Sequence, residues 1–276
     1  FSITLGGRYT WDERSANILR QNYLGGGSPF FGGAGVPFGA ASTNFQGSRS
    51  FNKFTPRVLA SWEPNDDTTV YASFSQGFKG GGFDPRGVGA NAPDYNGNGI
   101  RGENTEVAQF LSFRPESVDS YEIGYKGNLF DGALYLALAG FYADYTDIQI
   151  PGSVACTVAG LPSFCGVTSN AGAATFKGVE AEFNARLGEG IAADGDRLSL
   201  MGAVGYIDAQ FDEYITNIAN VPTDVANFRQ VQNTPEWTAS GTLAYMTPLG
   251  AGRLNLGTTV SYRSSVNQFE IPNPYI

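Results

Sequence analysis

The stretch VEAEFNARL, residues 179–187, alternates strictly between apolar and polar side chains. Its odd positions are all apolar, and its even positions are Glu180, Glu182, Asn184 and Arg186. Successive side chains of a β-strand point to opposite faces, so a period of two gives a strand with one apolar and one polar face. These residues therefore predict a strand that separates two different environments.

The same alternation recurs along the chain, and helical periodicity is almost absent. Six further windows carry no charge on their apolar face: 3–11, 70–78, 121–129, 198–206, 237–245 and 254–262. The window 134–142 is apolar on both faces, but Ala137 and Ala139 make one face small. The window 54–62 contains Pro56, which suggests a bulge or a strand end. Together these windows predict nine strands.

The segments between the predicted strands alternate between long and short. The long ones cover about 12–50, 81–116, 151–172 and 217–234, and the tight turns lie at 64–67, 130–132, 188–196 and 248–252. Long loops on one rim only are typical of outer-membrane barrels. We therefore predict an all-β fold: a partial antiparallel up-and-down transmembrane β-barrel. A soluble β-sandwich or solenoid is the alternative, although several loops above about 15 residues are uncommon there.

Aromatic side chains lie towards the strand ends on the apolar face, as the interfacial girdles of a membrane barrel require. They are Tyr9, Trp11, Trp62, Phe78, Trp237, Tyr245 and Tyr262.

Composition excludes several classes of function. The 276 residues carry a formal charge of −9 and only 16% charged residues, so no basic field attracts nucleic acid. Histidine is absent and there are two cysteines, which excludes a zinc site of Cys and His ligands and a Ser-His-Asp mechanism. The longest apolar stretch, 132–143, is shorter than the about 20 residues that a transmembrane helix needs.

Several motifs resemble one family. The stretch YASFSQGFKGGGF at 71–83 is similar to a strand and loop of TonB-dependent outer-membrane receptors. Five shorter stretches resemble the same family, in its order: FTPR at 54–57, ESVDSYEIG at 116–124, FYADYTDIQ at 141–149, KGVEAE at 177–182 and NTPEW at 233–237. Each is weak alone, but together they cover most of the chain.

The resemblance implies a barrel of about 22 strands with a separate plug. Residues 1–276 would then be a single partial barrel domain from its C-terminal half, with the plug, the early strands and the final strands outside this chain. It implies location in the outer membrane and energy-coupled uptake of a bulky nutrient. The implied partners are outer-membrane lipid, the protein's own plug, the TonB energy-coupling complex and a small-molecule ligand.

A ferric siderophore is the commonest cargo of the family, with oligosaccharide, cobalamin and aromatic compounds as rivals. A passive porin-type channel is a further alternative, and an outer-membrane barrel enzyme is the weakest because the chain lacks histidine. We expect no catalytic residue and no cofactor.

Candidate substrate contacts lie in the predicted outer loops. Phe30, Phe31 and Phe38 would form an apolar lip in the uncharged stretch 21–48, or that stretch is loop filler. Positive groups are available at Lys79, Arg86, Arg101 and Arg114, but five acidic residues share the same loop. Charge therefore does not decide the substrate.

Charges on the predicted strands fall on the face that would line the lumen: Arg8, Arg57, Lys79, Glu122, Lys126, Glu180, Glu182 and Arg186. They either guide the substrate or reflect the ordinary polarity of a hydrated interior.

The sequence DYNGNG at 94–99 resembles the start of a calcium loop, with oxygen-bearing side chains at Asp94, Asn96 and Asn98. The spacing then departs from the pattern, since position twelve is Thr105 and Glu106 is thirteenth. Asn-Gly repeats also form ordinary turns, so a cation site and a plain turn both remain open.

Cys156 and Cys165 lie nine positions apart in a predicted outer loop. An oxidising compartment favours a disulfide between them, and two unpaired thiols are the alternative.

Overall fold

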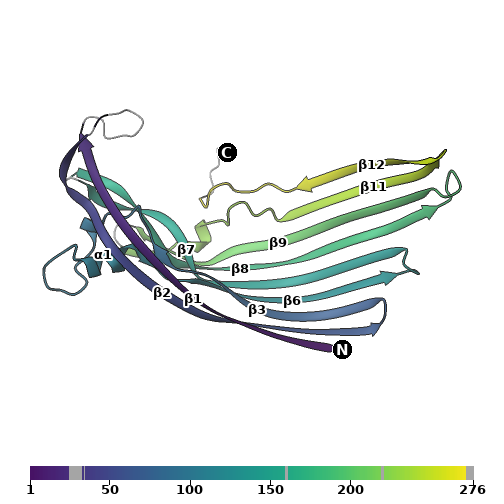
Figure 1. Cartoon of the computed structure of the whole chain (residues 1–276), viewed down its shortest axis with the longest axis horizontal. Coiled ribbons are helices and arrows are strands. Elements are labelled where there is room, and N and C mark those ends of the chain that lie inside the picture. Colours follow the sequence, from purple (N-terminus) through teal and green to yellow (C-terminus); the bar gives the residue numbers. More distant parts are fainter. Residues whose placement is uncertain (25–32, 34, 159–160, 219–220, 272–276) are drawn as a thin grey trace.

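A curved antiparallel sheet forms most of the molecule (Figure 1). The computed structural model describes residues 1–24, 33, 35–158, 161–218 and 221–271. The sheet order is β1-β2-β3-β6-β7-β8-β9-β11-β12, and β10 pairs with β9. The strands of this sheet are β1 (Ser2–Leu24), β2 (Val36–Asn65), β3 (Thr68–Lys79), β6 (Glu116–Leu129), β7 (Leu134–Val158), β8 (Leu161–Glu189), β9 (Arg197–Ile218), β10 (Val221–Asp224), β11 (Trp237–Leu249) and β12 (Gly252–Arg263).

All nine predicted strands are present, in sequential order, and each contains the window that predicted it. The four tight turns are also confirmed: β2–β3, β6–β7, β8–β9 and β11–β12 are joined by short connections. The β6–β7 turn needs left-handed backbone at Phe130, Asp131 and Gly132, where φ lies between 52° and 76°. We name this end of the sheet the turn end, and the opposite end the loop end.

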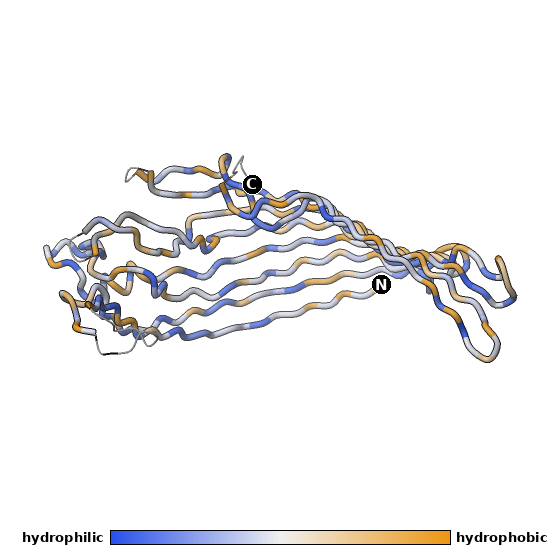
Figure 2. The backbone as a smooth tube through the Cα atoms, turned by 90° about the horizontal axis from the view of Figure 1, so that it is seen from above, coloured by the Kyte–Doolittle hydropathy of each residue, from blue (hydrophilic) through white to orange (hydrophobic). Residues whose placement is uncertain are grey.

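The cross-strand register puts apolar and polar side chains on separate faces. Ile123 lies opposite Gly140, which lies opposite Val179, which lies opposite Tyr206. The neighbouring row, Gly124, Ala139, Glu180 and Gly205, belongs to the other face. Figure 2 shows the resulting alternation of hydrophobic and hydrophilic residues along each strand. We name these the apolar face and the lumen face.

Large side chains of the apolar face are solvent-exposed in the isolated chain. Ile123 is 63% exposed and Val179 57% exposed, although both lie in the middle of the sheet. Such a face requires an apolar surrounding, which hydrocarbon provides. In the described residues β1 and β12 lie at the two edges and are not paired with each other, so the sheet is an open part of a barrel wall.

Three of the predicted long loops are wrong in extent, because the strands continue far beyond the alternating windows. β1 and β2 stay paired from Trp11–Asn52 to Leu24–Val36, where a loop to about residue 50 is predicted. β7 and β8 likewise pair from Gly152–Val167 to Val158–Leu161, within the predicted loop 151–172. In the third, 217–234, β9 runs to Ile218 and β10 follows. Outside hydrocarbon both faces of a hairpin meet water, so the alternation that predicts strands is no longer required there.

Pro56 marks the end of one ladder rather than a bulge. β2 pairs with β3 only from Arg57 onwards, whereas its pairing with β1 passes through Pro56 without a break. Proline has no N–H to donate, so it fits where the hydrogen bonding on one side of a strand stops. Beyond this point the β1–β2 ladder continues without a β3 partner, and side-chain contacts with the segment 80–115 and with Ser117 of β6 support the hairpin.

The segment 80–115 corresponds to the remaining one of the four predicted long loops, and it does not form an extended hairpin. It contains β4 (Gly82–Phe83) paired with β5 (Ser112–Phe113), a 3-10 turn η1 (Gly89–Asn91) and the helix α1 (Asn104–Leu111). Among the described residues, no helix has the length and apolar character needed to cross a bilayer.

The buried core lies at the loop end. Phe45 of β2 is 1% exposed and packs with Ala92, Val107 and Leu111 of the segment 80–115. A second cluster joins β7, β9 and the 3-10 turn η2 (Ala226–Phe228) through Ile150, Tyr214, Val225 and Ala226. Hydrophobic burial therefore fixes the loop-end segments, while main-chain hydrogen bonds hold the wall.

Two neighbouring residues of β9 test the assignment of the faces. Val204 lies on the apolar face and Ala203 on the lumen face, opposite Glu182. In the full-length protein that carries this chain, we expect Val204→Arg to destabilise the folded barrel by about 2–4 kcal/mol, because it places a charge against hydrocarbon. The measure is reversible urea unfolding in lipid vesicles. The matched variant Ala203→Arg should fold with little loss, and an equal loss in both variants would contradict the assignment.

Candidate functional site

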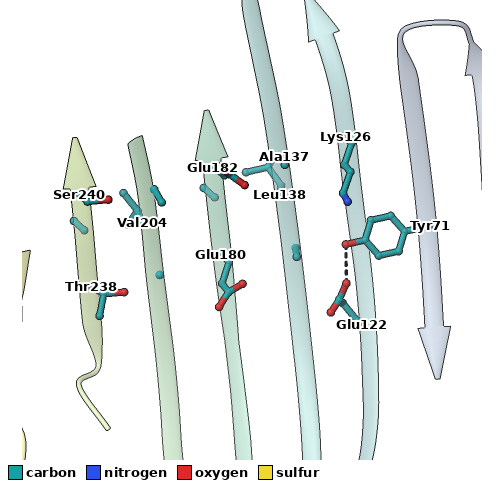
Figure 3. Close-up of a pocket in the computed structure, with 15 residues that line it drawn as sticks. Tyr71, Glu122, Lys126, Ala137, Leu138, Glu180, Glu182, Val204, Thr238 and Ser240 are labelled. Carbon is teal, nitrogen blue, oxygen red and sulfur yellow. Dashed lines mark hydrogen bonds between the residues drawn. The ribbon is translucent and has the colours of Figure 1, made fainter. Parts of the chain in front are cut away.

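Two hollows on the lumen side of the sheet are candidate functional sites. The first lies in the wall, between the turn end and the loop end, and has a volume of about 470 Å³ (Figure 3). Its charged members are Glu122, Lys126, Glu180 and Glu182. The second lies at the loop end, between the segment 80–115 and the strands β2, β7, β8 and β9. We name them the wall hollow and the loop-end groove.

Small residues create the wall hollow. Ala137 and Ala139 of β7, and Ala203 and Gly205 of β9, leave space between the longer side chains of β6 and β8. Ala137 and Ala139 are the residues that make one face of 134–142 small in the sequence. All four small residues lie at positions of the lumen face, so the hollow results from the same alternation that predicts the strands.

A polar cluster borders the wall hollow on β3 and β6. The Tyr71 hydroxyl donates to Glu122 Oε1 at 2.6 Å, and Lys126 Nζ lies 5.6 Å from the centre of the Tyr71 ring (Figure 3). The ring lies across Gly124: a Cβ at that position would come within 2.3 Å of it. Glycine at 124 therefore allows Tyr71 to reach across to Glu122.

The wall hollow is acidic. Glu122, Glu180 and Glu182 outnumber Lys126, and both β8 carboxylates point into the hollow (Figure 3). The arrangement supports a hydrated inner surface that disfavours bound anions.

The loop-end groove has a volume of about 540 Å³ and a mixed lining. Its cations are Arg49 and Arg114, its aromatic side chains are Tyr95, Phe110 and Tyr214, and hydroxyl and amide groups come from Ser112, Thr168 and Asn170. This volume is in the range of pockets for small-molecule ligands. Cationic, aromatic and hydroxyl groups in one cleft suit a polar, partly aromatic ligand with anionic oxygens.

Arg49 is the groove residue that sequence reasoning missed. It lies in β2, in a stretch that is predicted as loop. In the described part of the chain it forms no ion pair; its Nη1 donates to Ser112 Oγ at 2.5 Å, and its guanidinium lies 5.9 Å from the Phe51 ring centre. No sequence motif marks Arg49, and it reaches the groove because the β1–β2 hairpin folds there.

Three of the four predicted cations are paired with carboxylates in the structure. Arg114 lines the groove, and its guanidinium is paired with Asp147 at 2.5 Å. Lys79 lies 3.7 Å from Glu116. Arg86 binds Asp84 at 2.7 Å, and Arg101 is exposed on the turn that precedes α1. Lys79, Arg86 and Arg114 are thus each neutralised by a carboxylate, which weakens their attraction for an anionic ligand.

The predicted apolar lip can be followed only in part. Phe38 lies in β2 and is 49% exposed, away from the groove lining. Phe30 and Phe31 lie outside the described residues.

Asp84 ties the segment 80–115 to the barrel wall. Its carboxylate is 3% exposed and accepts hydrogen bonds from the Arg86 main chain, the Arg86 guanidinium and the Thr168 hydroxyl of β8, the last at 2.8 Å. Burial raises the pKa of Asp84, but the donors of Arg86 and Thr168 outweigh it and hold the pKa below its ordinary value.

Cys156 of β7 and Cys165 of β8 are joined by a disulfide in the structure. Cys165 is buried, and the bond links the two strands near the end of their hairpin. It limits the separation of these strands beside the loop-end groove.

The Asp94 loop lies beside α1. Asp94 accepts hydrogen bonds from the main-chain N–H groups of Gly97, Asn98 and Gly99 at 2.6–3.2 Å. No group of three or more acidic, Cys or His residues in the described chain has the geometry of a metal site.

We expect the Asp84 contact to persist at mildly acidic pH. A carboxylate with a lowered pKa contributes stability above its ordinary pKa of about 4, which is lost as the pH falls through the lowered value. Hydrogen exchange of the Arg86 amide, corrected for intrinsic rates, should therefore show equal protection at about pH 7 and pH 5. Asp84→Asn should raise tryptic cleavage after Arg86, whereas Asp66→Asn at the turn end should not. Cleavage that is unchanged in Asp84→Asn would contradict this role.

The disulfide is tested by mass spectrometry of the non-reduced protein. We expect a tryptic peptide pair that contains Cys156 and Cys165 and gains two hydrogen atoms on reduction. Alkylation of both thiols without prior reduction would contradict the bond.

Comparison with known proteins places this geometry in a family. The model of the TonB dependent receptor-like beta-barrel matches residues 1–275. The metal-pseudopaline receptor CntO of Pseudomonas aeruginosa is 28% identical over 174 residues, which are 61% of this chain and 19% of that protein.

Solved structures have a similar fold. The ferric yersiniabactin uptake receptor FyuA of Yersinia pestis has a TM-score of 0.58 and 20% identity, over 94% of this chain and 31% of that one. The ferric preacinetobactin receptor BauA of Acinetobacter baumannii has a TM-score of 0.52 and 20% identity, over 82% and 28%. The chain thus spans less than a third of these relatives. With the family model covering nearly every residue, the chain belongs to the TonB-dependent receptor β-barrel family.

Proposed function

We propose that this chain is part of an outer-membrane receptor that imports a metal–siderophore complex by TonB-dependent transport. The full-length protein would complete the barrel with further strands and hold a plug in the lumen. The TonB energy-coupling complex would act on that plug. The family membership supports the transport class, and the loop-end groove supports the type of cargo.

The observation that carries the proposal is the chemistry of the loop-end groove. Arg49 presents a guanidinium that no carboxylate of the described residues neutralises, next to the Ser112 hydroxyl. Tyr95, Phe110 and Tyr214 add aromatic surface to the same cleft. A guanidinium with adjacent hydroxyl and aromatic groups suits the anionic oxygens and aromatic rings of a metal chelate. A neutral oligosaccharide would not need the cation.

Orientation follows from the difference between the two ends. The short turns at the turn end correspond to periplasmic turns, and the loop end corresponds to the extracellular side. In this orientation the groove would lie where a ligand arrives, and the wall hollow further along the inner surface. A disulfide at the loop end suits an oxidising compartment outside the cytoplasm.

The names of the relatives agree with this cargo. CntO is a receptor for metal-pseudopaline, and FyuA takes up ferric yersiniabactin. Both names describe a ligand that contains a metal. We therefore favour a metal–siderophore complex over cobalamin, an aromatic compound or a passive flux of small solutes.

The test uses the full-length protein in a host that lacks its own siderophore receptors. Uptake of radioactive iron is measured with ferric complexes of catecholate, hydroxamate and carboxylate chelators, with and without the host's TonB. We expect at least one complex to enter only when TonB is present. Uptake that persists without TonB would support a porin, and no uptake of any metal chelate would reject the proposed cargo.

Arg49 provides a sharper test of the groove. We expect Arg49→Gln to weaken binding of the transported complex by about tenfold or more, since a charge-assisted hydrogen bond contributes about 1.5–3 kcal/mol. The matched control is Arg253→Gln, on exposed β12 near the turn end. Binding to the purified protein in detergent is measured by calorimetry. Equal affinity of the two variants would remove the groove from the binding site.

A further inference from the structure

The Asp94 loop has the oxygen chemistry of a calcium site up to its sixth position. Asp94, Asn96 and Asn98 occupy the first, third and fifth positions. Gly99 is the sixth, where calcium loops need glycine for a sharp turn, and its φ is +83°. What the sequence lacks is an acidic residue at position twelve.

The fold supplies the missing carboxylate from Glu106. The first turn of α1 brings Glu106 back to the loop, where its Oε1 accepts the Tyr95 main-chain N–H at 2.9 Å. The Glu106 carboxyl group thereby lies close enough to Asp94 to interact with that carboxylate directly. A residue at position thirteen thus takes the place of the residue at twelve, because the helix begins immediately after Glu103.

Among the acidic side chains of this loop, Glu106 has a carboxylate oxygen that is buried and unpaired in the described structure. This oxygen is Oε2, and the residue as a whole is 2% exposed. A buried carboxylate oxygen without a donor is costly, and a second carboxylate beside it increases the cost. Either a proton or a cation between the two groups would remove this cost.

The surrounding groups favour a cation. The main-chain N–H groups of Gly97, Asn98 and Gly99 all donate to the Asp94 carboxylate, at 2.6, 3.2 and 2.8 Å, which orders this side chain in the loop. Glu103 Oε2 accepts both side-chain amides, from Asn96 Nδ2 at 2.9 Å and Asn98 Nδ2 at 2.8 Å. One carboxylate thus holds both amides by their NH₂ groups, as outer partners of metal ligands do. Asn96 Oδ1 accepts the Asn98 main-chain N–H at 2.9 Å and Asn98 Oδ1 accepts that of Ile100 at 2.8 Å, which leaves each oxygen one lone pair for a cation. Arg101, the cation of this loop, forms no ion pair in the described residues.

We propose that Asp94, Asn96, Asn98 and Glu106 bind a Ca²⁺ ion, with Glu103 orienting the two amides. Oxygen ligands from carboxylates and amides, in a loop with flexible geometry, suit calcium better than a transition metal. The site lies at the start of α1, whose Val107 and Leu111 pack against Phe45 of the β1–β2 hairpin. Its neighbour Tyr95 lines the loop-end groove. Calcium would therefore fix one side of that groove.

This proposal does not depend on the identity of the cargo. Calcium binding is measured in the absence of any siderophore, so its failure would leave the proposed transport untouched. Failure of iron uptake would equally leave the calcium site untouched.

The experiment uses the full-length protein in detergent, stripped of divalent ions. Tb³⁺ replaces Ca²⁺ as a probe, and its luminescence is excited through tyrosine, since Tyr95 lies inside the loop. We expect saturable luminescence that Ca²⁺ displaces with an apparent dissociation constant of about 0.1–1 mM, the range of extracellular modules. We also expect Ca²⁺ to slow tryptic cleavage after Arg101. No saturable binding up to about 10 mM Ca²⁺ would overturn the proposal.

Variants locate the site. Asp94→Asn and Glu106→Gln preserve size and should each weaken Ca²⁺ binding by about tenfold or more. Asp66→Asn, in the β2–β3 turn, is the matched control and should leave binding unchanged. The heat-dependent gel shift of each variant checks folding. If Glu106→Gln binds Ca²⁺ like the wild type, Glu106 is not a ligand and the proposed ligand set is wrong. If a variant fails to fold, the wild-type titration and the Arg101 cleavage still decide.

Discussion

A strand that faces hydrocarbon must find partners for every N–H and C=O within the protein, and this requirement determines the rest of the molecule. Sequential antiparallel pairing satisfies it, and the pairing fixes which residues share a row. Once Val179 lies opposite Gly140 and Tyr206, Glu180 must lie with Ala139 and Gly205 on the other face. The apolar face and the acidic wall hollow are therefore consequences of one register. Neither needs a packed interior of the kind that stabilises a soluble domain.

Packing becomes important only where the strands leave the membrane. There Phe45, the helix α1 and the cluster around Tyr214 bury apolar surface, and Asp84 bonds the segment 80–115 to Thr168. These contacts bring together residues that are far apart in sequence, such as Arg49 and Ser112. The loop-end groove is thus built by conventional tertiary packing on top of a wall that does not depend on it.

Much of the fold could be predicted because lipid imposes a pattern on individual residues. Alternation predicts all nine strands, and the Asp-Gly and Pro-Asn turns predict where they reverse. The extended hairpins could not be predicted, because strands in water need no apolar face. The loop-end groove was predicted less well, because a motif shows which charged residue is present but not which residue pairs with it in the fold. Lys79 and Arg86 are paired with Glu116 and Asp84, whereas Arg49 is in a stretch with no motif.

The end of the β2–β3 ladder at Pro56 has a consequence for how the protein can change over time. Past that residue the β1–β2 ladder has no β3 partner and continues to Leu24–Val36, so insertions or substitutions in its outer part, beyond the Trp11–Asn52 pair, leave the lipid-facing rows undisturbed. Recognition and membrane sealing are then under separate selection. A receptor arranged in this way can acquire a new ligand, or evade an antibody or phage that binds its outer surface, while its barrel wall stays constant.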